Sequence, residues 1–168
     1  MRGAFSRLTA LLVVTATAVL AHDPLEITAD VRLAGEWMEV TITQSRFTAL
    51  ALCAEATGGR KTFGPNQFDE VKPALEKCAR GVFPVSVAGR KLVPKLVEAT
   101  LTRESDIEFR LVFPRPAKGP VQLDAALLRT LKDPGYGVLV TVIADHALVV
   151  RRTLHVDDST MEAALPTR

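Results

Sequence analysis

The sequence predicts a mainly β protein, an antiparallel β-sandwich of about eight strands with a helical hairpin inserted between strands two and three. Three observations support this fold. Apolar and polar residues alternate in several short runs, which is the pattern of strands that bury one face. Turn residues separate these runs at the short spacings typical of sandwiches. Only residues 45–80 replace the alternation with the three- and four-residue spacing of amphipathic helices.

The first two predicted strands form a hairpin. Every second residue is apolar over 25–33, and the same alternation returns over 38–43. Between these runs, Ala34, Gly35 and Glu36 make a short turn that contains glycine. Because both runs alternate so regularly, we expect each strand to have one buried and one solvated face.

A helical pair is predicted for residues 45–80. Ser45 is a suitable N-cap for the first helix, and Gly58 and Gly59 end it. Pro65 opens the second helix. The apolar residues of that helix recur at helical spacing: Phe68, Val71, Leu75 and Cys78.

Strand periodicity then continues to the end of the predicted domain, which covers residues 22–156. The expected strands are 83–87, 97–101, 106–113, 121–131, 137–143 and 147–156. The run 138–143 is apolar on nearly both faces, which indicates a central strand. A tight turn at Asp145 and His146 leads into the last strand. Its expected inward-facing residues are Leu148, Val150, Leu154 and Val156. Residues 157–168 are expected to form a flexible tail.

Residues 1–21 have the features of a secretory signal peptide. Arg2 and Arg7 precede the apolar run 8–20, which ends in small residues suited to cleavage. This run is too short for a comfortable membrane span. We therefore expect an exported protein, periplasmic or extracellular, whose mature chain begins at His22 and has no membrane span.

The charge balance argues against a nucleic-acid partner. Loss of the signal peptide removes two arginines and no acid, so the 21 Lys and Arg residues fall to 19, equal to the 19 Asp and Glu residues. A neutral chain without a basic stripe lacks the electrostatic footprint of nucleic-acid binding. We expect the partner to be a protein or another envelope component that is recognised through shape.

Cys53 and Cys78 are the only cysteines, and one falls in each predicted helix. Oxidising compartments favour a disulfide between them, and such a link stabilises by about 3 kcal/mol in the chain-entropy model. In an ideal antiparallel hairpin, however, Cys53 would lie about 5 Å and Cys78 about 18 Å from the turn. A disulfide needs Cα atoms within about 7 Å. The alternatives are a disulfide between steeply crossed helices and two buried free thiols.

Three histidines are the candidate metal ligands. As the first mature residue, His22 offers its α-amino nitrogen and its imidazole to copper. Such a site needs a further histidine, either His146 in the predicted turn or His155 on the polar face of the last strand. The alternative is that these are surface histidines with no shared site.

No combination of residues predicts an enzyme. The sequence contains neither a G-x-S-x-G elbow nor an H-E-x-x-H pair. Glu39, Asp106 and Glu108 fall on outward strand faces, where solvated charge is the ordinary interpretation. Trp37 begins a strand and is expected to pack over the end of the sandwich. Two hypotheses follow, an exported non-catalytic binding or accessory domain and a small metal-binding protein.

A family resemblance extends over almost the whole mature chain. The segments that carry it are HDP after the signal, ITADVRL, QFDEVKPALEKCA, FPVSVAGRKLVP, IEFRLVFPRP and GVLVTVIADHALVVRRTL. Together they resemble the extracytoplasmic N-terminal region of the HupE/UreJ-type nickel/cobalt permeases and their stand-alone relatives. This resemblance implies an exported domain without catalytic residues.

The resemblance also implies an EF-hand-like calcium loop between the helices, since relatives often have one. The corresponding segment here is ATGGRKTFGPNQF. Its ligand positions hold Ala56, Gly58 and Arg60, and its last position holds Gln67, so the acids that calcium needs are missing. We therefore expect no calcium binding at this loop and no cofactor, unless the histidines bind copper or nickel. No apolar run approaching 18 residues follows the signal, so transport is not carried over. A disulfide between the helices would then replace the calcium as a staple.

Overall fold

A computed structural model describes residues 26–117 and 119–165. The strands are β1 (Glu26–Ala34), β2 (Trp37–Ser45), β3 (Val85–Val87), β4 (Arg90–Lys91), β5 (Leu96–Leu101), β6 (Asp106–Pro114), β7 (Val121–Asp124), β8 (Gly137–Ala144), β9 (Ala147–Leu154) and β10 (Thr160–Ala163). The helices are α1 (Arg46–Leu52), the short 3-10 helix η1 (Pro65–Gln67), α2 (Phe68–Val82) and α3 (Ala126–Leu131). The predicted signal peptide and His22 lie outside the described residues.

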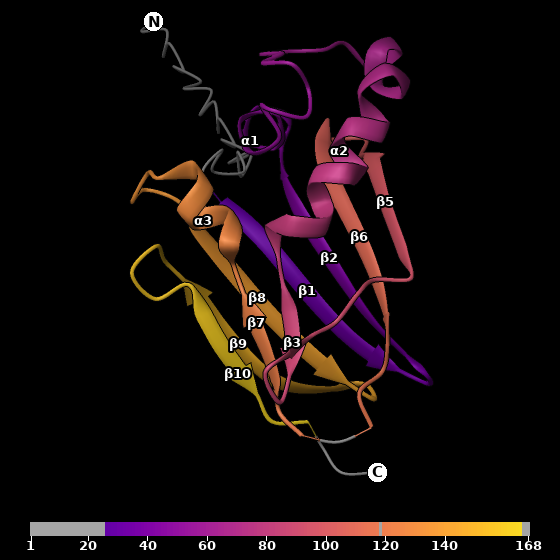
Figure 1. The fold of residues 1–168 in the computed structure, drawn as a ribbon, viewed down its shortest axis with the longest axis vertical. Helices are drawn as coiled ribbons and strands as arrows, with labels where there is room; N and C mark the ends of the chain where they lie inside the picture. Colours follow the sequence, from indigo (N-terminus) through magenta and orange to yellow (C-terminus); the bar gives the residue numbers. More distant parts are fainter. Residues whose placement is uncertain (1–25, 118, 166–168) are drawn as a thin grey trace, which may run out of the picture.

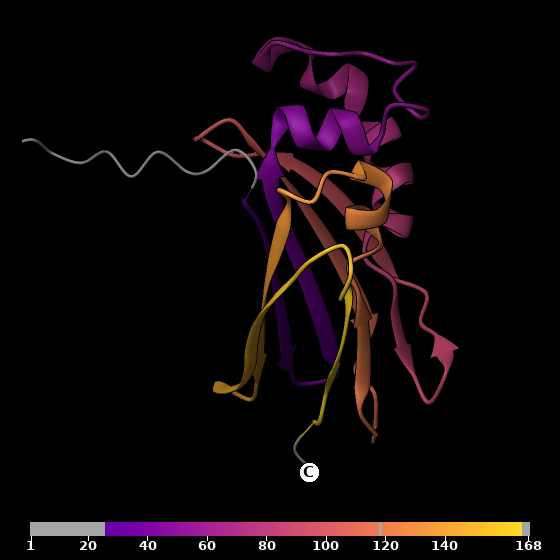
Figure 2. The ribbon, with the colours of Figure 1, turned by 90° about the vertical axis from the view of Figure 1, so that its left-hand side faces the viewer.

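Two sheets form the body of the protein (Figures 1 and 2). The larger sheet has the strand order β5-β6-β2-β1-β8-β9, and the smaller has the order β10-β7-β3-β4. We call the end of the larger sheet with the β1–β2 and β8–β9 turns the turn end, and the opposite end, at α1, the helical end. The predicted mainly β class is confirmed. The described chain has ten strands, where about eight were expected.

The expectation of a purely antiparallel fold is wrong at the centre of the larger sheet. There β1 and β8 run parallel, with Ile27 opposite Val138 and Leu33 opposite Ala144. The β1–β2 hairpin occupies only one edge of β1, which leaves the other edge free for β8. Because β8 lies between β1 and β9, the prediction that its apolar run is central is confirmed.

The core lies between the sheets and is completed by helices. The inward-facing residues of β1, β2, β6 and β8 that the core buries are Ile27, Ala29, Val31, Leu33, Met38, Val40, Ile42, Ile107, Phe109, Leu111, Phe113, Val138, Val140, Val142 and Ala144. The four-stranded sheet is too narrow to cover this face alone. Helix α2 packs on β5 and β6, and α1 packs on β2 and β6 (Figure 1). The helices therefore take the place of the strands that a full sandwich would need.

Three segments differ from the sequence-based prediction. The run 121–131 was expected to be extended, but it divides into β7 and α3. Residues Arg90–Lys91 form the two-residue strand β4. The prediction of a free tail is wrong for Thr160–Ala163, which pairs with β7 as β10. The physical reason is the alternation of Met161 and Ala163, whose side chains reach the core.

Strand β9 is at an edge and follows its predicted alternation only in part. Asp145 and His146 both have positive φ, as a two-residue hairpin turn requires, so the predicted turn is confirmed. A bulge then places Val150 opposite Val142 but Leu148 opposite Ile143. The extra residue reverses the faces, and Leu148 is exposed instead of buried.

The helical insertion lies between β2 and β3 as predicted, but it is not an antiparallel hairpin. The Ser45 hydroxyl accepts a hydrogen bond from the Thr48 amide at 3.1 Å, which confirms the N-cap. Helix α1 lies across the direction of α2 (Figure 2). Cys53 and Cys78 form a disulfide with a Cα–Cα distance of 5.6 Å. The crossing removes the offset that an ideal hairpin would impose. Among the described residues, no helix is long and apolar enough to cross a membrane.

Gln44 is the exception in the apolar face of β2. Its side chain is buried, and neither amide atom has a hydrogen-bond partner among the residues that the structure describes. A buried amide without partners loses its solvation and gains nothing in return. Gln44 should therefore destabilise the fold relative to an apolar side chain of similar shape.

We predict that Gln44→Met raises the free energy of unfolding by about 1 kcal/mol, because it removes this desolvation cost. Urea denaturation would measure the change. Ile42→Met on the same face of β2 is the control and should lower stability by no more than about 1.5 kcal/mol. A loss of stability in Gln44→Met would contradict the prediction.

Candidate functional site

The outer face of the six-stranded sheet is a regular surface that the core does not use. Along β2 and β6, buried residues alternate with half-buried polar ones such as Glu39, Thr41 and Arg110. Neither the smaller sheet nor a helix of the described chain covers this face (Figure 2). It is therefore available to a partner.

A groove crosses this face near the turn end. The strand pairings align one outward-facing residue from each strand in a row: Leu96 on β5, Val112 on β6, Glu39 on β2 and Arg32 on β1. We call this row and its neighbours Ala34, Trp37, Lys95 and Arg110 the Trp37 groove. It has a volume of about 500 Å³. Trp37 is 53% exposed and Leu96 is 44% exposed.

Large apolar side chains gather at the turn end. The described chain has five exposed large hydrophobic residues: Trp37, Phe47, Val93, Leu96 and Leu148. Val93 lies in the segment that leads into β5, and Leu148 follows the β8–β9 turn. Thus only Phe47, at the start of α1, lies at the helical end. Of these residues, Trp37 and Leu96 line the same groove, and exposed apolar side chains that share a groove are typical of an interaction surface.

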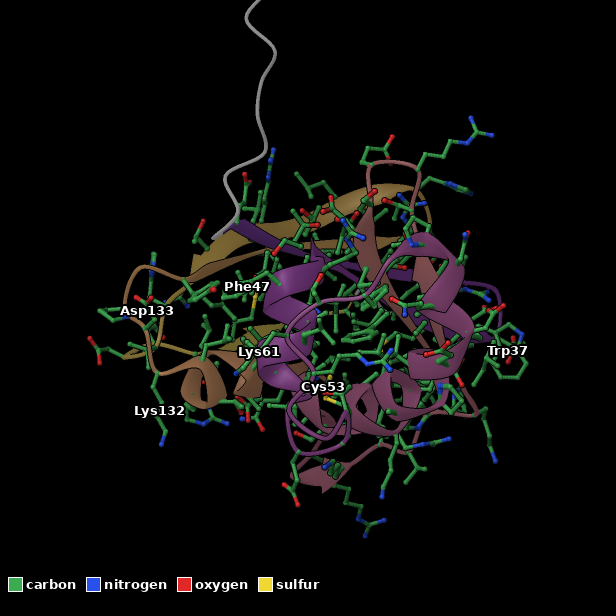
Figure 3. All side chains as sticks on the ribbon, turned by 90° about the horizontal axis from the view of Figure 1, so that it is seen from above. Trp37, Phe47, Cys53, Lys61, Lys132 and Asp133 are labelled. Carbon is green, nitrogen blue, oxygen red and sulfur yellow. A yellow bond between two sulfur atoms is a disulfide. The ribbon has the colours of Figure 1, made fainter. Side chains whose placement is uncertain are left out.

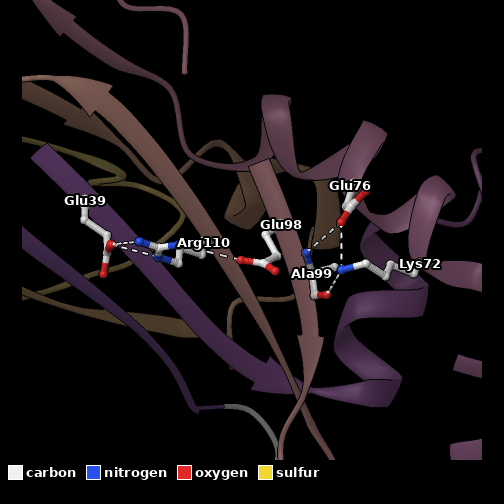
Figure 4. A network of polar contacts seen from close by, with 6 residues as sticks. All are labelled: Glu39, Lys72, Glu76, Glu98, Ala99 and Arg110. Carbon is white, nitrogen blue, oxygen red and sulfur yellow. Dashed lines mark hydrogen bonds and ion pairs between the residues drawn. The ribbon is translucent and has the colours of Figure 1, made fainter. Parts of the chain in front are cut away.

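An ion-pair network that includes two residues of the groove, Glu39 and Arg110, crosses the sheet (Figure 4). The Arg110 Nε donates to Glu39 Oε2 at 2.7 Å, and its guanidinium also lies 3.6 Å from Glu98 Oε2. The hydrogen bond with Glu39 is the main cause that raises the pKa of Arg110. Arg110 therefore stays charged and is already occupied by two carboxylates. By contrast, Arg32 and Lys95 have no ion-pair partner in the part of the chain that the structure describes.

Arg115 holds the strands together at the turn end. Its side chain is only 6% exposed and donates two hydrogen bonds of 2.6 Å to the carboxylate of Asp145 in the β8–β9 turn. Its backbone amide donates to the carbonyl oxygen of Glu36 in the β1–β2 turn. A bidentate guanidinium pair fixes both position and orientation. The frame beneath the groove is therefore tied together across three strand ends.

Helix α2 closes the neighbouring edge of the sheet (Figure 4). The Lys72 Nζ donates to the Ala99 carbonyl oxygen at 2.6 Å, and the Ala99 amide donates to Glu76 Oε1 at 3.3 Å. Lys72 and Glu76 also form an ion pair at 2.9 Å. These contacts satisfy both backbone groups that Ala99 turns away from β6. They block strand addition at the middle of β5.

Of the three predicted metal ligands, the structure describes two, His146 and His155, and they lie far apart. His146 lies at the turn end and His155 just beyond the opposite end of β9, so the length of the strand, about 27 Å, separates them. They cannot bind the same ion. The described residues contain no group of three or more His, Cys, Asp or Glu side chains that could hold a metal ion.

A second hollow lies at the helical end. It has a volume of about 510 Å³ and includes Phe47, Lys61, Phe63 and Glu104 in its lining. Figure 3 shows Phe47 and Lys61 beside α1, away from Trp37. Phe47 is its only large exposed apolar side chain. The Trp37 groove is lined by two such side chains, Trp37 and Leu96, and therefore offers more apolar surface to a partner.

Comparison with known proteins adds no further information on the site. No protein-family model matches the chain, and no match to it is found among curated proteins. The function must therefore be argued from the geometry.

Sequence reasoning found parts of the Trp37 groove without recognising it. The alternation correctly placed Glu39 on an outward face. It could not show that β2 pairs with β6, which brings Glu39 to Arg110. Trp37 was expected to pack over the end of the sandwich, but it lies half-exposed on the outer face. The signal that could have identified it is a lone tryptophan next to a turn residue.

The Glu76 contacts predict a pH-dependent contribution to stability. The hydrogen bond from Lys72 is the main cause that lowers the pKa of Glu76 below its ordinary value of 4.5. A group whose pKa is lowered by folding contributes stability above its unfolded pKa and loses it as the pH falls. At neutral pH, Glu76→Gln should lower the free energy of unfolding by up to about 1 kcal/mol.

Urea denaturation at a series of pH values would test this. The difference between wild type and Glu76→Gln should shrink as the pH falls below 4.5. Glu104→Gln, in the exposed β5–β6 turn, is the control for loss of a carboxylate. A difference that stays constant down to low pH would contradict the assignment.

Proposed function

We propose that this protein is an exported, non-catalytic binding domain that recognises a partner through the Trp37 groove. The single observation that carries the proposal is a groove of about 500 Å³, lined by the exposed Trp37 and Leu96, on a sheet face that nothing in the described chain covers. Tryptophan and arginine are enriched among the residues that dominate binding energies. The groove contains both, on four neighbouring strands.

The rigidity of the site supports this function. Each lining strand is paired on both sides or, for β5, held by α2. A preorganised surface loses little conformational entropy when a partner binds. The site therefore suits binding without rearrangement.

The expected location is a further part of the proposal. The disulfide between Cys53 and Cys78 is compatible with an oxidising compartment outside the cytoplasm. The relationship to the N-terminal region of the HupE/UreJ-type permeases is kept as a hypothesis that rests on the sequence segments alone.

Selection from a random peptide library displayed on phage would test the groove. We expect wild-type protein to enrich peptides that Trp37→Ala no longer retains, because the mutation removes the largest apolar surface of the site. Phe47→Ala, which truncates the exposed aromatic residue at the helical end, is the matched control and should retain them. Enriched peptides that bind Trp37→Ala as well as wild type would contradict the proposal.

A second candidate function, copper binding, is favoured by one observation. Strand β1 begins at Glu26 opposite Gly137, and a Cβ atom added to Gly137 would lie 3.4 Å from the His155 ring. His155 thus lies at the end of the sheet where β1 begins. The four residue steps from His22 to Glu26 can span at most about 14 Å, so we infer that His155 is the only described histidine within reach.

Cu(II) titration of mature protein that begins at His22 would test this candidate. His155→Ala should weaken binding at least about tenfold, because an imidazole ligand is lost, whereas His146→Ala should leave it unchanged. Adding one residue before His22 should abolish the site, since the α-amino ligand is displaced. Equal behaviour of the two histidine variants would exclude this site.

A further inference from the structure

We propose that the partner places an extended, acidic segment of its chain across the strands in the Trp37 groove. The segment has two carboxylates at positions i and i+4, with an apolar side chain at position i+2 between them. The carboxylates pair with Arg32 and Lys95, and the apolar side chain packs on Trp37 and Val112. This inference rests on the proposed function and adds the chemistry of the occupant.

The excess of basic side chains in the groove favours an anionic partner. Three of the lining side chains are basic, Arg32, Lys95 and Arg110, and one is acidic, Glu39. Glu39 is already bound to Arg110 at 2.7 Å. The groove therefore contains two cations, Arg32 and Lys95, that have no ion-pair partner in the described chain. A cationic ligand could bind Glu39 only by breaking its ion pair with Arg110.

The spacing of the cations selects an extended segment. Lys95 directly precedes β5, and Arg32 is on β1, with β6 and β2 between them. Three strand intervals of about 4.8 Å separate the two backbones by about 14 Å. An extended chain advances about 3.3 Å per residue, so this distance corresponds to about four residues. Residues i, i+2 and i+4 of such a chain face the same side.

The apolar side chains at the centre of the groove favour an apolar residue at position i+2 of the partner segment. Val112 lies in the row between the two cations, and Trp37 forms the adjacent wall. A side chain at position i+2 would reach this point when positions i and i+4 are at the cations. Ion pairs between the carboxylates of the segment and the exposed Arg32 and Lys95 contribute only moderately to affinity. The apolar contact with Trp37 and Val112 therefore supplies much of the affinity, and the carboxylates fix the register.

The lone tryptophan makes the test direct, because Trp37 is the only one in the chain. Its fluorescence would be followed during titration with acetyl-Ser-Glu-Ser-Leu-Ser-Glu-Ser-amide. The matched peptides replace both Glu residues by Gln or by Lys. The titrations would extend to about 10 mM, so that weak binding is also measured.

We expect the Glu peptide to shift the Trp37 emission and to bind several-fold more tightly than the Gln peptide, with the Lys peptide weakest. Arg32→Ala and Lys95→Ala should each weaken the Glu peptide about threefold. Arg90→Ala, which removes an exposed arginine on β4 outside the groove, should have no effect. At about 1 M salt, the Glu and Gln peptides should converge, because exposed charges are then screened.

The remaining outcomes would each overturn the inference in a distinguishable way. Equal binding of the Glu and Gln peptides at low salt would show that the groove binds chains without selecting acids, so the proposed function would stand alone. If no peptide shifted the Trp37 emission while the phage selection still depended on Trp37, the inference about the acidic segment would also fail and the proposed function would stand. A hexanoate titration with the same dependence on Arg32 and Lys95 would instead identify a small amphiphilic acid as the occupant.

Discussion

The architecture depends on one constraint, which is that the apolar face of a six-stranded sheet must be removed from water. Four strands contribute an unbroken series of buried residues to this face, from Ile27 on β1 to Ala144 on β8. Apolar area of this extent is the main favourable contribution to folding. A sheet of four strands cannot cover it, and the helices between β2 and β3 supply the remaining cover. The disulfide fixes the crossing of α1 and α2 over that face.

The same constraint explains how much of the fold could be predicted from the sequence. Where a strand buries one face only, as β1, β2 and β6 do, alternation identified the strand and its inward residues correctly. Alternation failed at Leu148 because a bulge reverses the faces without leaving a signal in composition. It also failed for 121–131, because the apolar residues 125–128, which follow the alternating residues 121–124, suit a helix as well as a strand. Residues 160–163 were too few to stand out from a polar tail.

The candidate site was less predictable than the fold for a different reason. Each strand's outward residues could be read from the sequence, but the order of strands in the sheet could not. Leu96, Val112, Glu39 and Arg32 become neighbours only because β5, β6, β2 and β1 are adjacent in that order. Long-range pairings of this kind depend on the whole chain. The histidines show the opposite case. His146 and His155 are close in sequence and are both plausible ligands, but strand β9 holds them at its two ends.

The parallel pairing of β1 and β8 has a consequence for how the chain reaches its final shape. Ile27 meets Val138, a residue 111 positions later, so the centre of the larger sheet forms only after nearly all of the polypeptide is present. Contacts between residues so distant in sequence are typical of proteins that fold slowly. During synthesis, β1 therefore lacks its parallel partner β8 until most of the chain has been made. Until β8 is present, the edge of β1 that it covers stays open to pairing with other strands.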